Sequence, residues 1–251
     1  MGFLHGSGQE TNCPLPYLYG MAGYPYSHLH HPAPNHRDFR GKAYMEIIFV
    51  RHGESEGNAF SGRDKVFCGQ WDYPLTERGY RQAKALAGNS LFEHAEAFFV
   101  SDLKRAVETA RSITNTELTM DPRLRERSLG EFEGKKVEVI MNAPQYAGYF
   151  TDPALSSFRN SFTEKAPHGE NYSDVCNRVR PFLQELIRQG YHKVVIISHS
   201  VAIRCMIKEI RGLSEEETLS LDVPNCFPIK LVWQPGINLC AEADESGEQT
   251  K

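Results

Sequence analysis

Short apolar runs alternate along the chain with segments whose apolar residues recur at helical spacing. Runs long enough for buried strands predict strands at 46–50, 97–100 and 193–197, with shorter ones at 118–120 and 229–232. Helical spacing predicts helices at 76–86, 103–113, 173–189 and 201–210. The strands are apolar on both faces, which is typical of a parallel sheet covered on both sides. The pattern therefore predicts an α/β fold, a three-layer α/β/α sandwich with a mostly parallel central sheet.

Polar residues stand where several of these helices are expected to begin. Thr76 is expected to cap the first helix, with Gly88 as its stop. Ser101-Asp102 is expected to cap the second helix, and Ser173 the third.

Composition and charge exclude several classes of protein. Of 251 residues, 40% are hydrophobic, enough for a sizeable core, and the net charge of −4 argues against a basic nucleic-acid binder. The chain has no apolar run of about 18 residues, so no membrane span is expected. Its six cysteines are dispersed without a C-x-x-C pair, which predicts free thiols in a reducing, cytoplasmic setting.

The two ends of the chain differ from its middle. Residues 1–44 hold five of the ten His, five of the 14 Pro and five of the 11 Tyr, without periodic patterning. They predict a flexible extension, favoured over a metal site built from His28, His30, His31 and His36. An alternative expectation is that the natural chain starts at Met45, directly before the first predicted strand. A single domain is expected over 45–240, followed by a polar tail over 241–251.

Charged and polar residues follow three of the predicted strands directly. Arg51-His52 follows the first, Ser101-Asp102 the second with Arg105 soon after, and Ser198-His199 the strand at 193–197. In such sheets ligands bind at the carboxyl ends of the strands. Two guanidinium forks suit a phosphate, and a neutral imidazole can attack phosphorus. Because the sequence has neither a P-loop nor a carboxylate cluster suited to magnesium, it predicts a metal-free anion site without a cofactor.

A series of motifs continues from these residues along the chain. In order they are RHGESEGN at 51–58, PLTERG at 74–79, SDLKRAVETA at 101–110, LRERSLG at 124–130 with FEG at 132–134, GEN at 169–171, and SH at 198–199. Together they resemble the signature of the histidine phosphatase superfamily, the group that includes cofactor-dependent phosphoglycerate mutase. The resemblance spans residues 46 to about 210, and its strength lies in the order of the motifs.

The resemblance implies a role for each matching residue. His52 would be the nucleophile that forms a phosphohistidine. Arg51, Arg105 and His199 would bind the transferring phosphoryl group, with help from Asn58. Their positive charge would stabilise the charge on its oxygens.

The same resemblance implies the proton donor and a substrate contact. Glu126 would protonate the leaving oxygen and then activate the attacking water, although Glu131 and Glu133 compete for this role by position. Cys68 and Gly69 fall where relatives often contact substrate.

The chain departs from the family pattern at two positions and leaves one segment to interpret. Ser200 and His168 stand where the family often has Gly; Ser200 would crowd the phosphate or cap the next helix. Residues 135–168 are expected to form a small cap over the active site. The cap holds Tyr146, Tyr149, Phe150, Phe158 and Phe162 with Lys135, Lys136, Arg159 and Lys165. Most of these aromatics are expected to pack the cap onto the sheet, and the mixture suits a modest organic phosphate.

These observations favour a phosphatase that hydrolyses small phosphomonoesters. A phosphoglycerate mutase activity is the first alternative, but the longer insert and basic tail typical of such mutases are not evident. A catalytically silent phosphate-binding protein is the second, suggested only by Ser200. The substrate and the oligomeric state stay open.

Overall fold

The computed structural model describes residues 44–235. The tail expected over 241–251 and, except for Tyr44, the extension over 1–44 with its histidine cluster lie outside the described residues. None of the helices in the described range has the length and apolar character needed to cross a bilayer.

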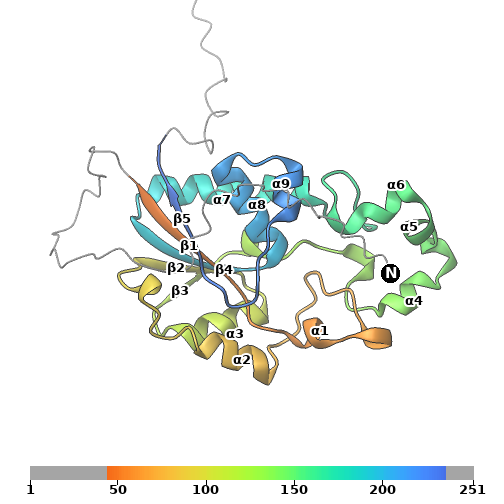
Figure 1. Cartoon of the computed structure of the whole chain (residues 1–251), viewed down its shortest axis with the longest axis horizontal. Helices are drawn as coiled ribbons and strands as arrows, with labels where there is room; N and C mark the ends of the chain where they lie inside the picture. Colours follow the sequence, from red (N-terminus) through yellow and green to blue (C-terminus); the bar gives the residue numbers. More distant parts are fainter. Residues whose placement is uncertain (1–43, 236–251) are drawn as a thin grey trace, which may run out of the picture. The chain divides into compact units, whose positions relative to one another are not determined.

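A five-stranded sheet forms the centre of the domain (Figure 1). Its strands are β1 (Met45–Arg51), β2 (Ala97–Val100), β3 (Leu118–Met120), β4 (Lys193–Ser198) and β5 (Ile229–Trp233). The strand order is β3-β2-β4-β1-β5, and every pair is parallel except β1 with β5. All five predicted strands are present, and the expectation of a mostly parallel sheet is confirmed.

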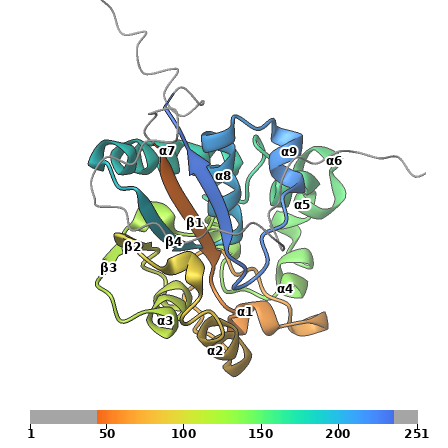
Figure 2. The ribbon, with the colours of Figure 1, turned by 60° about the vertical axis from the view of Figure 1, so that its left-hand side comes forward.

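Helices cover both faces of this sheet (Figures 1 and 2). One face carries α2 (Glu77–Lys84) and α3 (Lys104–Ile113), and the other carries α7 (Tyr172–Gln189) and α8 (Ser200–Arg211). Shorter helices are α1 (Glu56–Ala59), α4 (Val137–Met141), α5 (Gly148–Thr151), α6 (Pro153–Ser156) and α9 (Glu215–Ser220). The predicted three-layer arrangement is confirmed.

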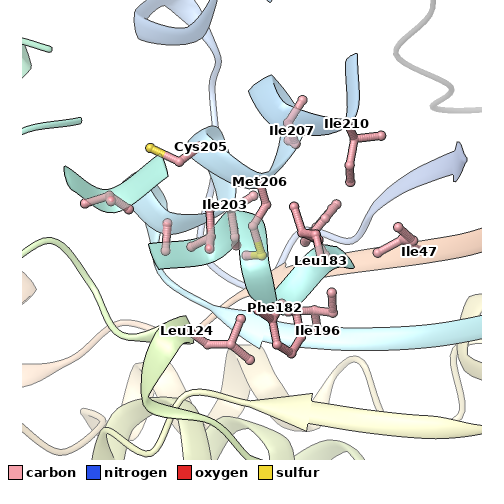
Figure 3. Close-up of a cluster of buried hydrophobic side chains, with 14 of the residues drawn as sticks. Ile47, Leu124, Phe182, Leu183, Ile196, Ile203, Cys205, Met206, Ile207 and Ile210 are labelled. Atoms are coloured by element: carbon pink, nitrogen blue, oxygen red, sulfur yellow. The ribbon is translucent and has the colours of Figure 1, made fainter. Parts of the chain in front are cut away.

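Alternate residues of the central strands feed two separate hydrophobic clusters. In β1, Ile47 and Phe49 face the α7–α8 side, whereas Ile48 and Val50 face the α3 side. Figure 3 shows part of the first cluster, where side chains of α8 lie over Phe182, Leu183 and Ile196. Because each fully buried side chain of this size stabilises the fold by about 1.5–3 kcal/mol, the two clusters fix the sheet and its strand ends rigidly.

One of the three predicted helix caps is confirmed and two are wrong. The hydroxyl of Thr76 accepts a hydrogen bond from Gly79 N, as expected of an N-cap. Helix α3 instead has Leu103 at its N-cap; the hydroxyl of Ser101 accepts from Leu103 N at 3.3 Å and lies 2.8 Å from Nε2 of His199. Helix α7 is capped by Asn171, which exchanges hydrogen bonds with Asp174 and so starts the helix before Ser173.

The segment between α4 and residue 160 folds into short helices with its own hydrophobic cluster. Phe158 is 1% exposed and packs edge-on against Phe132 and near Phe67. Tyr146, Tyr149 and Phe150 join this cluster rather than the core under the sheet. The expectation that these aromatics pack onto the sheet is correct only for Phe162, which lies in the α7–α8 cluster. The others pack against the two loops that carry Phe67 and Phe132.

Candidate active site

Two histidines meet where β1 and β4 end. The strands are adjacent and parallel, so Arg51 pairs with Ser198 and the residues that follow leave the sheet at the same edge. The backbone N–H of His52 still donates to Ser198 O at 3.0 Å. This register places the imidazoles of His52 and His199 with ring centroids 4.9 Å apart, and both side chains are buried.

Arg105, from the first turn of α3, completes the centre of the site. Its Nε lies 3.3 Å from Nε2 of His52 and 3.3 Å from Nδ1 of His199, so one N–H is shared between two imidazoles. Its terminal nitrogens donate to Trp71 O at 2.9 Å and to Gly69 O at 2.8 Å. Each terminal nitrogen keeps a second hydrogen for another acceptor. The guanidinium is therefore fixed in place and can still bind an anion.

These contacts determine where the imidazole protons sit. Nδ1 of His52 lies 2.6 Å from Gly53 O, and because a carbonyl only accepts, Nδ1 carries the proton and Nε2 has the free lone pair. His199 accepts from Arg105 at Nδ1, so its Nε2 donates to the hydroxyl of Ser101 at 2.8 Å. Burial first, and then the charge of Arg105, lowers the pKa of both histidines well below the usual 6.5. Both rings are therefore neutral at pH 7.

Arg51 brings a second guanidinium to the same edge. Its Nη1 donates to Val223 O at 2.9 Å, while its Nε is buried without a hydrogen-bond partner. Burial lowers the pKa of this guanidinium, and the nearby carboxylate of Glu126 opposes that shift. A buried cation with an unused donor is suited to an incoming anion.

Glu126 lies in the loop that follows β3, and its side chain is beside these groups, next to the first turn of α8. Its Oε1 accepts from its neighbour Arg127 N at 2.7 Å and from Val201 N at 3.3 Å. Its backbone carbonyl accepts from Gln70 Nε2 at 2.9 Å and from Arg178 Nη2 at 3.0 Å. Both ends of the residue are thus held, and the carboxyl group is positioned near Arg51 and Arg105, whose charges it compensates.

The two competing glutamates are engaged elsewhere. Glu131 accepts from the hydroxyl of Tyr146 and lies 3.3 Å from Nε2 of His168. Glu133 accepts with one oxygen from Gln70 N at 2.9 Å and Leu129 N at 2.7 Å. Glu133 therefore joins two loops by their backbones, which leaves Glu126 as the carboxyl group beside the histidines.

An ion pair that sequence reasoning missed holds the loop of Glu126. Arg178, on α7, pairs with Glu170 at 2.8 Å and donates to the carbonyls of Arg123 and Glu126. Glu170 accepts from Ser128 N at 2.9 Å and donates its own N–H to Ser128 O at 2.9 Å. Glu170 was visible within the motif at 169–171, but its partner lies eight residues further on and depends on the path of α7.

The remaining predicted positions lie around this centre. Gly69 adopts a φ of 48°, and a Cβ there would lie 2.4 Å from Oε1 of Glu133, so only glycine suits the site. Half-buried Cys68 is close enough to Arg105 and Glu126 to feel both charges, and burial raises the pKa of its thiol. Asn58 is exposed, and its Oδ1 accepts from Ser55 N at 3.3 Å.

The two departures from the family pattern have different structural settings. Ser200 is the first residue of α8, whose N-cap is His199, so the expectation that its hydroxyl caps this helix is wrong. His168 adopts a φ of 57°, in the left-handed region where a glycine is least strained. Within residues 44–235, no three His, Cys, Asp or Glu side chains gather in a group that could hold a metal ion.

The sheet edge therefore carries two neutral imidazoles, one buried and one partly buried guanidinium, and one carboxyl group. This set defines a site with the chemistry to bind and transfer an anionic group. Residues 47–242 match the histidine phosphatase superfamily (branch 1), and the chain belongs to that superfamily. The resemblance seen in its motifs is thereby confirmed.

Relatives include phosphatases and mutases. Phosphoserine phosphatase 1 of Hydrogenobacter thermophilus is 32% identical over 187 residues, which cover 72% of this chain and 83% of that protein. The 2,3-bisphosphoglycerate-dependent phosphoglycerate mutase of Neisseria meningitidis serogroup B is 29% identical over 218 residues, which cover 74% of this chain and 93% of that protein. Among solved structures, a mycobacterial glucosyl-3-phosphoglycerate phosphatase with VO3 aligns at a TM-score of 0.63 and 28% identity, over 74% of this chain and 90% of that one.

Proposed function

We propose that this chain is a metal-independent phosphatase that hydrolyses small phosphomonoesters through a phosphohistidine intermediate. The observation that carries the proposal is the hydrogen bond of His52 Nδ1 to Gly53 O, which leaves Nε2 unprotonated beside Arg105. A neutral, oriented imidazole next to two guanidiniums is what nucleophilic attack on a phosphate requires. The named phosphatases among its relatives support the same reaction.

The proposed reaction has two steps. In the first, the Nε2 lone pair of His52 forms a bond to phosphorus while the ester P–O bond breaks, and Glu126 gives its proton to the leaving oxygen. In the second, Glu126 takes a proton from water, whose oxygen bonds to phosphorus as the P–N bond breaks. Phosphate and free His52 result. Arg51 and Arg105 stabilise the charge on the phosphoryl oxygens in both steps, and His199 joins them once the bound phosphate dianion raises the pKa of its ring and the ring takes up a proton.

The surrounding residues are given supporting roles. Asn58 assists phosphate binding, while Cys68, Gly69 and Ser200 contact the substrate. The segment over 135–168 acts as the cap that covers it. A small phosphorylated molecule is the proposed partner. The described cysteines, Cys68, Cys176, Cys205 and Cys226, are free thiols, which supports a reducing, cytoplasmic compartment.

The direct test is hydrolysis of p-nitrophenyl phosphate in the presence of EDTA. Wild-type protein should release phosphate, vanadate should inhibit it, and His52→Ala should abolish it. Rapid quenching with a ³²P-labelled substrate should trap acid-labile label on His52. A broad panel of phosphate esters left unhydrolysed by folded protein would refute the proposal and favour a silent phosphate-binding protein.

A mutase is the second candidate, supported by the similarity that extends over 93% of the Neisseria mutase. The two activities differ in the fate of the phosphoryl group. With 3-phosphoglycerate and a catalytic amount of 2,3-bisphosphoglycerate, a mutase would form 2-phosphoglycerate faster than free phosphate. We expect free phosphate to form faster, and the reverse result would select the mutase.

A further inference from the structure

Three arginines beside the site are connected through two shared aromatic residues. Arg127 donates from Nη1 to Phe158 O at 2.7 Å, and the guanidinium of Arg159 lies 5.8 Å from the centre of the Phe158 ring. Arg127 also lies 5.7 Å from the centre of the Tyr172 ring, whose hydroxyl accepts from Arg204 Nη1 at 3.0 Å. The three cations therefore form one continuous cluster, which we call the arginine cluster.

None of the three forms an ion pair with a carboxylate of the described residues, in contrast to four other arginines of the domain. Arg123, Arg125, Arg178 and Arg180 each do. Arg127 is only 7% exposed, and its Nε is buried without a hydrogen-bond partner, as is the Nε of Arg204. The charges of Glu126 and Glu170 act on Arg127, but neither carboxylate forms an ion pair with it. Burying a cation with an unmade hydrogen bond is costly, so the cluster keeps donors that the described residues leave unused.

Each member of the arginine cluster lies near a residue that belongs to the site or supports it. Arg127 follows Glu126 directly in the chain. Arg204 lies one turn beyond the N–H of Val201 that binds Glu126, and its charge helps lower the pKa of Arg51. Arg159 lies 4.7 Å from the centre of the Phe67 ring, two residues before the glycine that binds Arg105. A substrate leaving group next to Glu126 would therefore meet this cluster.

We propose that the leaving group carries a second anionic group, a carboxylate or a further phosphate, and that the arginine cluster binds it. This inference rests on the proposed phosphatase function and narrows its substrate class. The two charges of Arg51 and Arg105 already balance a phosphate dianion. A phosphomonoester with a neutral leaving group would therefore not need the positive charge of the arginine cluster. Two of the three cap lysines are already paired, Lys136 with Asp64 and Lys165 with Asp174.

The test compares substrates that differ only in the second anion. O-phospho-L-serine is paired with O-phosphoethanolamine, and 3-phosphoglycerate with glycerol 3-phosphate, for the carboxylate. Fructose 1,6-bisphosphate is paired with fructose 6-phosphate for the second phosphate. In at least one pair, kcat/KM should favour the doubly anionic member by about ten- to a hundredfold, the size of one or two charge-assisted hydrogen bonds. This preference should shrink as salt is raised.

Variants of Arg159 assign the preference to the cluster, because this side chain is partly exposed and less embedded than Arg127. Arg159→Gln should lower the ratio of kcat/KM within the favoured pair by about tenfold, and Arg159→Lys should restore most of it. Arg188→Gln is the matched control, since it removes the same charge from the exposed end of α7. It should leave the ratio and the activity unchanged.

The outcomes separate this inference from the function on which it rests. Hydrolysis of p-nitrophenyl phosphate with ratios near one in all pairs would overturn the inference and leave the phosphatase standing. So would equal losses for both members of the favoured pair in Arg159→Gln. If p-nitrophenyl phosphate is not hydrolysed, calorimetric titration with the phosphonate analogues of each pair still tests the inference. Equal affinity within every pair would then refute it.

Discussion

Arg105 directs its single Nε hydrogen at Nε2 of His52, across 3.3 Å. The guanidinium thus touches the atom that would attack phosphorus. Its two terminal nitrogens hold the carbonyls of Gly69 and Trp71, and it is 2% exposed. Nucleophile, cation and supporting loop form one connected unit, so a change in Arg105 should affect chemistry and loop geometry together.

The first prediction is that Arg105→Lys lowers kcat/KM by about 10²–10⁴ although the charge is kept. A lysine ammonium cannot bind Gly69 O and Trp71 O and also reach both histidines and a phosphate. Steady-state kinetics with p-nitrophenyl phosphate would measure the loss, and circular dichroism would verify folding. A folded variant with near-normal kcat/KM would contradict the role given to the guanidinium.

Much of this arrangement could be predicted from the sequence, because it follows from strand patterning. Apolar runs on both faces imply a covered parallel sheet, and parallel strands bring Arg51-His52 and Ser198-His199 to one edge. The motif order then pointed to Arg105 and Glu126. The structure brings all of these residues together, while their catalytic roles stay predictions.

The rest depends on tertiary geometry that local patterns do not contain. Ser101 resembles a helix cap, but its hydroxyl binds His199, a residue 98 positions away. Arg178 has the sequence appearance of an ordinary charge on a helix, and only the path of α7 brings it to the carbonyl of Glu126. In each case the contact that serves the site joins residues that only the tertiary fold brings together; Ser101 makes it in addition to a local bond from Leu103 N.

The second prediction separates proton donation by Glu126 from a purely structural role. In Glu126→Gln, kcat/KM for an alkyl phosphate should fall by about 10²–10⁴, because the alkoxide leaving group needs a proton. For p-nitrophenyl phosphate the fall should be much smaller, since the nitrophenolate leaves without one. Comparing kcat/KM isolates the phosphoenzyme-forming step. Equal losses for the two substrates would contradict the assignment.

The third prediction concerns the ion pair of Glu170 with Arg178. Arg178→Gln removes donors to the carbonyls of Arg123 and Glu126, so the carboxyl of Glu126 should lose its fixed position. We expect kcat to fall by about tenfold or more with little change in KM, together with a loss of about 1–3 kcal/mol in the free energy of unfolding.

Conservative replacement distinguishes positioning from general destabilisation in that experiment. Arg178→Lys keeps the charge opposite Glu170 and one donor, so it should recover part of kcat. The matched control is Arg180→Gln. Arg180 is on α7 like Arg178, and the substitution breaks its comparable ion pair with Glu209 of α8. It should lower stability without lowering kcat. A fall of kcat in parallel with stability in both variants would remove Arg178 from the catalytic argument.

The fourth prediction follows from the neutral state of His52 and His199. Burial lowers the pKa of both rings in the folded protein, whereas in the unfolded chain each has the ordinary value of about 6.5. Below that pH the unfolded chain binds more protons than the folded one, so acid favours unfolding. Stability should be complete above about pH 6.5 and fall as the pH drops toward the folded-state pKa values, by about 1.4 kcal/mol per pH unit for each histidine.

Urea unfolding between pH 7.5 and 5 measures this slope directly. The ordinary pKa values of carboxyl groups, near 4, lie below most of that range, so the two buried imidazoles should dominate it. His199→Gln removes one of them. As the pH is lowered below about 6.5, the unfolding free energy of this variant should decrease less steeply than that of wild type, by about 1.4 kcal/mol per pH unit. The comparison uses slopes, so a constant destabilisation by the variant does not affect it. Parallel curves of unfolding free energy against pH would mean that His199 is protonated to the same extent in the folded and the unfolded protein. The assignment of a neutral, hydrogen-bonded histidine pair at the ends of β1 and β4 would then be wrong.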